Sequence, residues 1–265
     1  MTKDNPNECF DYLAMLAHEF RTPLNVISST AQIVTHSQEL GKLEGEKLTE
    51  YMESIRRYCN RLTLLTNNMI DVASCDNGIF RLACENLDVE EFINTLVENT
   101  TVYKIKYNVK LKVKINLKFK HMICDFIKLE RILLNLLTNA VKFNCKKSKI
   151  ITLSVYDNAD DEVIFSMKDN GIGIPQEMIT LITDKFVRVG DFSTRNTEGC
   201  GLGLAIVDMF IKTLKGKLTI NSELGKGSEF TITLPRYQKT PSTANEARGF
   251  YQPLMSTIDI EFSNI

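Results

Sequence analysis

Two apolar heptad repeats in the first third of the chain constrain its fold more than any other feature. In each repeat the apolar residues recur at alternating steps of three and four, the a/d pattern of a long helix that packs on another helix. The first repeat comprises Phe10, Leu13, Ala17, Phe20, Leu24, Ile27, Ala31 and Val34, and the second Leu48, Tyr51, Ile55, Tyr58, Leu62, Leu65, Met69 and Val72. Residues 37–46 between them contain two glycines and few large apolar groups, and the sequence SCDNG at 74–78 ends the second helix. The pattern predicts an antiparallel helical hairpin.

A single hairpin cannot cover its apolar seam on both sides. The usual solution is a four-helix bundle made by two chains, so we expect a homodimer. An intramolecular coiled-coil arm is the alternative.

The sequence AHEFRTPLN at residues 17–25 lies within the first helix. His18 follows an a position and therefore takes position b, while Glu19 takes c and Thr22 takes f. These positions predict that all three side chains point away from the seam, with the histidine presented to solvent beside a carboxylate. An exposed histidine is usually inert, but Pro23 makes this one less ordinary, because proline inside a helix removes a backbone hydrogen bond.

The middle of the chain changes pattern. Residues 80–89 resemble a strand that leads into a helix at 90–99, with Asp88 as its N-cap. Residues 104–120 are rich in lysine and include the alternating KLKVKIN. A nucleic-acid surface is one interpretation, but the formal net charge is -1 and there is no aromatic stacking pattern. An amphipathic edge strand with a solvated lysine face is favoured.

The second half contains three recurring chemical elements. On a predicted helix over residues 125–143, Asn135, Asn139 and Lys142 share one face at i, i+4 and i+7. Strands at 150–156 and 162–168 precede the turn DNGIGIP, which begins at Asp169. GCGLGLAIV at 199–207 opens a helix that reaches about residue 214, strands at 217–221 and 229–234 follow, and 236–265 form a tail without assigned function.

These elements suit a nucleoside triphosphate. Glycine turns beside helix N-termini let backbone N–H groups approach phosphates closely. A side-chain amide oxygen suits Mg²⁺, a lysine offsets triphosphate charge, and an aspartate can accept a hydrogen bond from the adenine amine. The GxGxG run could by itself belong to a dinucleotide fold, but it would then directly follow the first strand of a βαβ unit, and here it comes late.

With these motifs in order, the chain resembles the transmitter region of a two-component sensor histidine kinase over residues 11–235. AHEFRTPLN resembles the family's H box, NLLTNAVKF (135–143) its N box, DNGIGI its first glycine box, FVRVGD (186–191) its F box and GCGLGLAIV its second glycine box. The resemblance implies an α-helical hairpin, as a dimeric four-helix bundle, followed by an α/β two-layer sandwich of the gyrase and histidine-kinase (Bergerat) ATPase type. We expect the hairpin at 8–76, the ATP-binding catalytic domain at 77–236 and the tail at 237–265.

The resemblance also implies a role for each site residue, with ATP and Mg²⁺ as cofactors. His18 would be the phosphoacceptor, Glu19 the base that activates it and Thr22 a group that positions water for hydrolysis of the phosphorylated partner. In the nucleotide site, Asn139 would coordinate Mg²⁺ with Asn135 beside it, Lys142 and Arg188 would contact phosphate, and Asp169 would hold the adenine amine. The remaining positions are glycines that shape the pocket and its lid (roughly 186–199): Gly171, Gly173, Gly199, Gly201 and Gly203.

Three features depart from the family pattern. Cys200 stands where threonine or serine is frequent, so a hydroxyl contact would be lost. Asn135 stands where hydrolytic relatives carry a glutamate base, which favours transfer to histidine over attack by water. Seventeen residues precede His18, which leaves no room within this sequence for a sensor or a membrane span.

Composition indicates the cellular compartment in which we expect the protein. The seven cysteines are scattered, with no CxxC pair, and three histidines make no metal constellation, so we expect reduced thiols in the cytoplasm. The N-terminus lacks signal-peptide order and no apolar run is long enough to span a bilayer.

The expected partners are a response-regulator receiver domain and a second copy of the chain, and not nucleic acid. A phosphatase-biased enzyme and a nucleotide-binding scaffold without chemistry are the alternatives.

Overall fold

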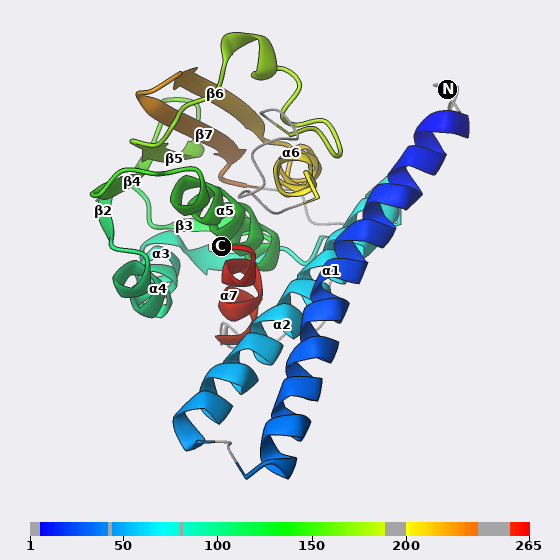
Figure 1. Cartoon of the computed structure of the whole chain (residues 1–265). Helices are drawn as coiled ribbons and strands as arrows, with labels where there is room; N and C mark the ends of the chain where they lie inside the picture. The colour runs from blue at the N-terminus through cyan, green and yellow to red at the C-terminus, as the bar shows by residue number, and fades with distance from the viewer. Residues whose placement is uncertain (1–5, 42–43, 80–81, 189–199, 238–254) are drawn as a thin grey trace.

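The computed structural model describes residues 6–41, 44–79, 82–188, 200–237 and 255–265. Two long helices form an antiparallel hairpin beside a compact domain of sheet and helices (Figure 1). The hairpin consists of α1 (Pro6–Glu39) and α2 (Gly45–Asp76). The two predicted helices are therefore confirmed, although the connection is shorter than the predicted 37–46 because α1 continues to Glu39.

The heptad seam is only partly covered within this chain. In the part of α1 whose side chains the structure describes, residues 14–39, the buried residues are Leu16, Pro23 and Thr30. In contrast, Ala17 and Ala31 are exposed, and the side chain of Leu24 is 52% exposed. One flank of the seam therefore has no cover from the chain's own second helix.

A five-stranded sheet forms one layer of the second domain. Its strands have the order β2-β4-β5-β7-β6, with β2 parallel to β4 and the other neighbours antiparallel. Helices α5 and α6 cover one face of it (Figure 1). The strands are β2 (Val109–Asn116), β4 (Lys149–Asp157), β5 (Glu162–Asp169), β6 (Lys217–Glu223) and β7 (Gly227–Pro235), and a separate pair is β1 (Glu85–Asp88) with β3 (His121–Cys124). The helices are α3 (Val89–Asn99), α4 (Thr101–Lys106), α5 (Phe126–Lys142), α6 (Gly203–Thr213) and the 3-10 turn η1 (Gln176–Met178).

The core lies between the helix layer and the inner face of the sheet. Buried side chains alternate along β4, as a period-2 strand with one covered face requires. The central strand β5 alternates at its start and then buries Phe165, Ser166 and Met167 in succession. The buried apolar side chains of both strands pack against apolar residues of α5, α6 and α3, with Phe165 and Phe210 among the largest fully buried side chains. The expected two-layer α/β sandwich is confirmed.

Local predictions mostly hold in this domain. Asp88 caps α3 by accepting a hydrogen bond from the Glu91 backbone N–H (3.0 Å). β2 lies at the sheet edge and exposes alternate residues, its lysines, to solvent. Two predictions differ in extent from the structure. In the lysine-rich segment 104–120 the strand is β2, and residues 104–106 belong to helix α4. In the predicted strand 80–89 the structure has β1 at Glu85–Asp88, and residues 80–81 lie outside the described residues.

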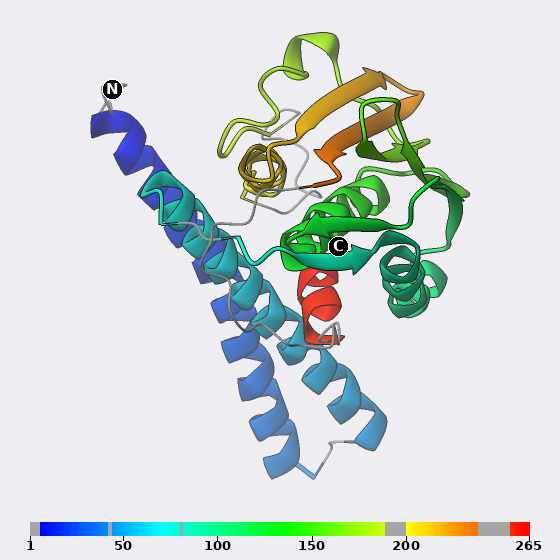
Figure 2. The same cartoon turned by 180° about the vertical axis from the view of Figure 1, so that it is seen from behind.

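The tail corrects a third prediction. The end of the chain is not a loose alternating segment but helix α7 (Met255–Glu261) and the 3-10 turn η2 (Phe262–Asn264). In both views this segment lies between α2 and the sheet domain, beside α5 (Figures 1 and 2). The segment is helical and packs on other helices, not on the edge of a sheet.

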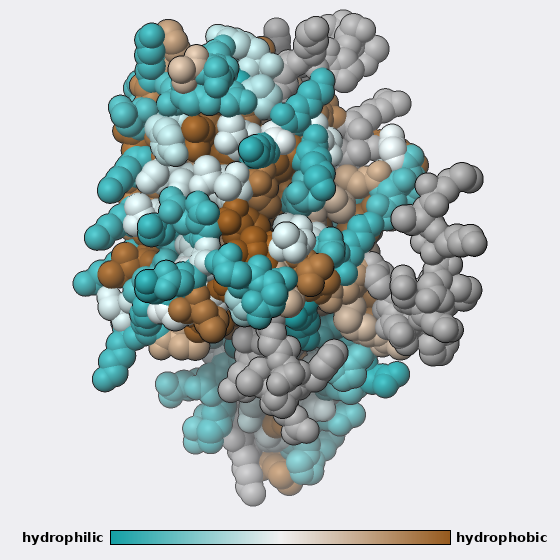
Figure 3. Space-filling view, turned by 90° about the horizontal axis from the view of Figure 1, so that it is seen from above, coloured by the Kyte–Doolittle hydropathy of each residue, from teal (hydrophilic) through white to brown (hydrophobic). Residues whose placement is uncertain are grey.

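The surface is mixed in character. Seen from above, hydrophobic side chains gather in the middle of the face, with hydrophilic side chains around them (Figure 3). Among the described residues, none of the helices is long and apolar enough to cross a membrane.

Candidate functional site

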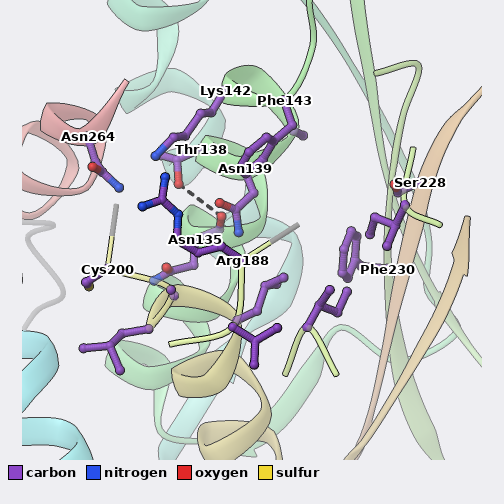
Figure 4. A pocket seen from close by; sticks show the side chains of 18 of the residues that line it. Asn135, Thr138, Asn139, Lys142, Phe143, Arg188, Cys200, Ser228, Phe230 and Asn264 are labelled. Carbon is purple, nitrogen blue, oxygen red and sulfur yellow. Dashed lines mark hydrogen bonds between the residues drawn. The ribbon is translucent and has the colours of Figure 1, made fainter. Parts of the chain in front are cut away.

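A pocket opens where α5, the turn after β5, the start of α6 and β7 meet the hairpin. Figure 4 shows polar side chains converging on one end of it and Phe230 and Ser228 lining the other. The predicted residues that line the pocket are Asn135, Asn139, Lys142, Asp169, Gly173, Arg188, Gly201 and Gly203. The structure therefore brings together residues that the sequence spreads over about 70 positions.

Helix α5 supplies the cationic, amide-rich end. Asp125 caps α5 by accepting from the Lys128 N–H (3.1 Å), and the helix then turns Asn135, Asn139 and Lys142 into the pocket. The Asn135 amide nitrogen donates to the carbonyl oxygen of Arg131 (3.0 Å), which fixes the orientation of that side chain. The Asn135 side-chain oxygen is directed toward Gly203, the first residue of α6.

The surroundings of Lys142 lower the pKa of its amino group. Burial, as the largest cause, lowers the pKa of Lys142 to about 8, and the positive charges of Arg61 and Arg188 act in the same direction. The negative charge of Glu19 acts in the opposite direction. An anion such as a phosphate would restore the full charge of Lys142, and residues of the hairpin lie close enough to influence it.

Asp169 occupies the other end, at the last position of β5. Its Oδ1 accepts hydrogen bonds from the backbone N–H groups of Gly171 (2.6 Å) and Ser228 (3.4 Å). Burial raises the pKa of this carboxyl group, and the two backbone donors oppose that effect. The second oxygen can accept from a ligand's amine.

Two glycines allow close approach here, one to the backbone and one to a side chain. A Cβ on Gly173, which has φ +72°, would lie 2.1 Å from the carbonyl oxygen of Glu223. A Cβ on Gly203 would lie 2.7 Å from the Oδ1 atom of Asn135. Glycine at these positions therefore keeps the turn after β5 and the start of α6 close to their neighbours.

The other predicted glycines are less uniform. Gly171 lies beside Asp169, where a Cβ would meet the Phe143 carbonyl oxygen at 2.5 Å. Gly201, with φ +68°, is packed against the backbone of Phe186. Gly199 and most of the predicted lid lie outside the described residues. Cys200 is buried at the pocket, and burial raises the pKa of its thiol.

The hairpin places its three predicted residues differently. His18 is exposed, as predicted. Thr22 is half-buried, and its hydroxyl donates to the His18 carbonyl oxygen (3.2 Å). The prediction that Glu19 points to solvent was wrong, because its Oε2 accepts from Arg61 of α2 (3.2 Å) and both side chains are almost buried. The heptad pattern predicts on which side of α1 the Glu19 side chain lies, but it does not predict that Arg61 of α2 is there to pair with it.

Sequence reasoning missed several pocket residues. Ser228 and Phe230 of β7 line the Asp169 end, Leu64 and Asn68 come from α2, and Asn264 comes from the end of the chain. A serine after the turn LGKG was visible in the sequence, but its backbone contact with Asp169 depends on the β5–β7 pairing. No local pattern indicates the residues of α2 or the tail.

This arrangement can hold a nucleotide with its base near Asp169 and its phosphates near Lys142 and Arg188. The donor chemistry also fits Mg²⁺, since amide oxygens of Asn139 and Asn135 beside phosphate oxygens form an oxygen-only ligand set. Among the described residues, no group of three or more histidine, cysteine, aspartate or glutamate side chains could hold a metal by itself.

Comparison with known families agrees with both halves of the chain. Residues 11–78 match the His Kinase A (phospho-acceptor) domain, and residues 124–238 match the Histidine kinase-, DNA gyrase B-, and HSP90-like ATPase family. The chain belongs to the sensor histidine kinases. The predicted resemblance to their transmitter region is thus confirmed.

Curated relatives of this kinase region are longer. It is 31% identical over 228 residues to the circadian input-output histidine kinase CikA of Thermosynechococcus vestitus, covering 85% of this chain and 31% of that protein. It is 29% identical over 237 residues to the aerobic respiration control sensor protein ArcB of Escherichia coli, covering 89% of this chain and 29% of that protein. The chain therefore spans about a third of the length of these relatives.

Solved structures share the fold of this kinase region. Full-length ShkA, solved in complex with AMPPNP, matches with a TM-score of 0.63 and 26% identity, over 87% of this chain and 47% of that one. The histidine kinase AdeS of Acinetobacter baumannii matches with a TM-score of 0.62 and 22% identity, over 83% of this chain and 98% of that one. The hairpin and the sandwich thus recur together in other histidine kinases.

Proposed function

We propose that this chain uses Mg-ATP to phosphorylate His18 and then passes the phosphoryl group to an aspartate of a response-regulator receiver domain. The observation that carries the proposal is the meeting of two parts: an exposed histidine on the hairpin, and a pocket lined by Asp169 and Lys142 whose wall includes α2. The charges of Glu19 and Arg61 act on Lys142 across this junction.

In the first step a ring nitrogen of His18 attacks the γ-phosphorus of ATP. A P–N bond forms, the P–O bond to ADP breaks, and Glu19 accepts a hydrogen bond from the other ring nitrogen, which increases the nucleophilicity of the attacking one. Lys142 and Arg188 neutralise charge on the phosphates, Asp169 holds the adenine amine, and bound Mg²⁺ would neutralise phosphate charge beside Asn139.

In the second step the receiver's aspartate attacks the same phosphorus. The P–N bond breaks, an acyl phosphate forms and His18 is regenerated. Both steps depend on position and charge neutralisation more than on covalent help from the protein. A phosphatase activity toward the receiver is a second candidate, supported by the position of Thr22 one turn after His18.

The kinase is proposed to work as a homodimer. The support is the uncovered flank of α1, where Leu24 lies between the exposed Ala17 and Ala31. A second hairpin would cover this flank and complete a four-helix bundle. The hairpin would be residues 8–76 and the catalytic domain residues 77–236.

Incubation with γ-labelled ATP tests the proposal. We expect label that is acid-labile and alkali-stable and that is absent from His18→Gln. His36→Gln is the matched control, because His36 is exposed on the same helix, and it should label like the wild type. Label that persists in His18→Gln would overturn the assignment of the phosphoacceptor.

Phosphotransfer profiling tests the second step. The labelled kinase is mixed with purified receiver domains from the source genome, and we expect rapid transfer to one or a few of them. Rapid loss of label from a receiver that was already phosphorylated would support the phosphatase activity. Label that stays on the kinase with every receiver would overturn the proposed partner.

A further inference from the structure

The segment 255–265 is attached to three helices that belong to different parts of the molecule. Its Asp259 accepts from the hydroxyl of Tyr103 in α4 and lies 3.7 Å from Arg56 of α2. Its Glu261 lies 3.5 Å from Arg131 of α5. The segment therefore bridges the hairpin and the catalytic domain.

Apolar packing accompanies these polar contacts. Ile258 and Phe262 are almost fully buried, with 2% and 4% of their surface exposed. The ring of Phe262 stacks on Tyr103, with centroids 4.2 Å apart, and also lies near Tyr107. Burying two large apolar side chains is a substantial stabilising contribution, and these contacts exist only when the segment is docked.

At Arg131 of α5 the catalytic domain contacts both the hairpin and the segment 255–265. The Arg131 guanidinium group donates to Asp71 and, at 2.8 Å, to Asn68 of α2, while Glu261 approaches from the other side. The Arg131 carbonyl oxygen accepts from the Asn135 side chain in the nucleotide pocket. Asn68 and Glu261 also line that pocket, so the junction and the site share residues.

The docked arrangement does not present the phosphoacceptor to the pocket. Leu64 and Asn68 are the described hairpin residues that line it, and His18 is exposed instead. Glu19 is held by Arg61. Phosphoryl transfer requires the attacking nitrogen about 3–3.5 Å from phosphorus, so His18 must come to line the pocket before it can react.

We infer that the segment 255–265 is an autoinhibitory clamp, which holds the catalytic domain on α2 in an arrangement that does not permit transfer to His18. An element that binds one arrangement and not the other stabilises that arrangement by its binding free energy. The inference rests on the proposed kinase function. It assigns to the segment a role in controlling when His18 is phosphorylated.

The test is a comparison of full-length variants. Ile258→Asp combined with Phe262→Ala removes the buried contacts, and Ile105→Asp is the matched control because Ile105 is 78% exposed on α4. Hydrogen exchange of residues 255–265 reports docking, AMPPNP binding reports an intact pocket, and label on His18 gives the initial rate at saturating ATP. We expect faster exchange in the segment and a rate roughly fivefold or more above the wild type, with the control unchanged.

Two results would overturn the clamp. One is an undocked segment with retained AMPPNP binding but a rate at or below that of the wild type. The other is a rate increase without loss of exchange protection. Phe262→Tyr keeps the aromatic stack and should keep the low rate, so a rate as high as that of the double variant would also count against it. Absence of label in every protein, wild type included, would instead refute the proposed kinase function.

Discussion

At the scale of single residues, the site depends on a few side chains whose orientation is fixed by hydrogen bonds with the backbone. Asp169 is the clearest case, since Gly171 and Ser228 hold one carboxylate oxygen and leave the other for a ligand. Asn135 is oriented in the same way by the carbonyl oxygen of Arg131. Such preorganisation reduces the cost of ordering the site when a nucleotide binds.

Asp169→Asn should weaken AMPPNP binding by roughly 10- to 100-fold, because hydrogen bonds to a charged group contribute about 1.5–3 kcal/mol. Calorimetry measures the affinity and light scattering the oligomeric state, which should not change. Asp160→Asn, an exposed position in the turn between β4 and β5, is the control. A change of oligomeric state in Asp169→Asn would show that the hairpin and the nucleotide site are not separate.

Gly173→Ala should destabilise the fold by about 2–5 kcal/mol, because it combines a left-handed backbone with a Cβ that meets the Glu223 carbonyl oxygen. Gly225→Ala separates these effects, since Gly225 has φ +82° and open space around its Cβ position. Its cost should be about 1–2 kcal/mol. Denaturant unfolding of the two variants measures the difference, and equal costs would contradict the steric explanation.

The residues of α5 and the glycine turns could be predicted because their spacing and their chemistry agree. Asn135, Asn139 and Lys142 recur at helical spacing, and most of the buried residues of the same helix are apolar. The Glu19–Arg61 pair could not be predicted, because a heptad assigns a direction relative to one partner helix. The heptad pattern does not show which residue of the other helix, 42 positions later in the sequence, will contact Glu19.

At the scale of elements, the packing of α7 and η2 on the hairpin and the catalytic domain could not be predicted from the sequence. The sequence IDIEFSNI alternates weakly and resembles a strand, yet the surrounding helices impose a helical turn. Its partner Tyr103 is 156 positions away, so no local window contains both. In contrast, α3 was predictable from its cap and β2 from its alternation, because both signals are local.

The docking of α7 should weaken as pH rises through neutrality. Burial, as the largest cause, raises the pKa of Glu261 to about 7. Arg131 lowers it, while Asp71 of α2 and Glu130 of α5 raise it. Because the docked carboxyl group prefers its proton, its contribution is complete below pH about 4.5 and is lost as pH rises through about 7.

Phe262→Trp provides the measurement, because the chain contains no tryptophan. Its emission should shift to longer wavelength between pH about 4.5 and 8 as the indole becomes exposed. In the Glu261→Gln background, where the titrating group is absent, the emission should stay constant over this range. A shift of the same size in both proteins would contradict the assignment to Glu261.

At the scale of the whole molecule, the hairpin leaves several large apolar side chains exposed. Leu24 of α1 and Met52 and Ile70 of α2 are each more than half exposed. Large apolar side chains aligned along a long helix favour association. The expectation of a homodimer from the heptad pattern thus remains the natural explanation for this surface.

Leu24→Glu should weaken self-association by roughly 100-fold or more, because a symmetric interface would bury two unpaired carboxylates. Light scattering across a dilution series measures this effect. Ile105→Glu, on the exposed side of α4, should leave the assembly unchanged. Persistence of the dimer in Leu24→Glu would place the interface elsewhere.

The shared wall of the pocket has a consequence for inhibitor design. Compounds that fill only the Asp169 end would meet groups belonging to the sandwich alone. A compound long enough to pass Lys142 would also reach Asn68 of α2 and Asn264 of η2. Such a compound would gain selectivity over proteins of the same sandwich fold that lack this wall, and it would bind most tightly while the segment 255–265 is docked.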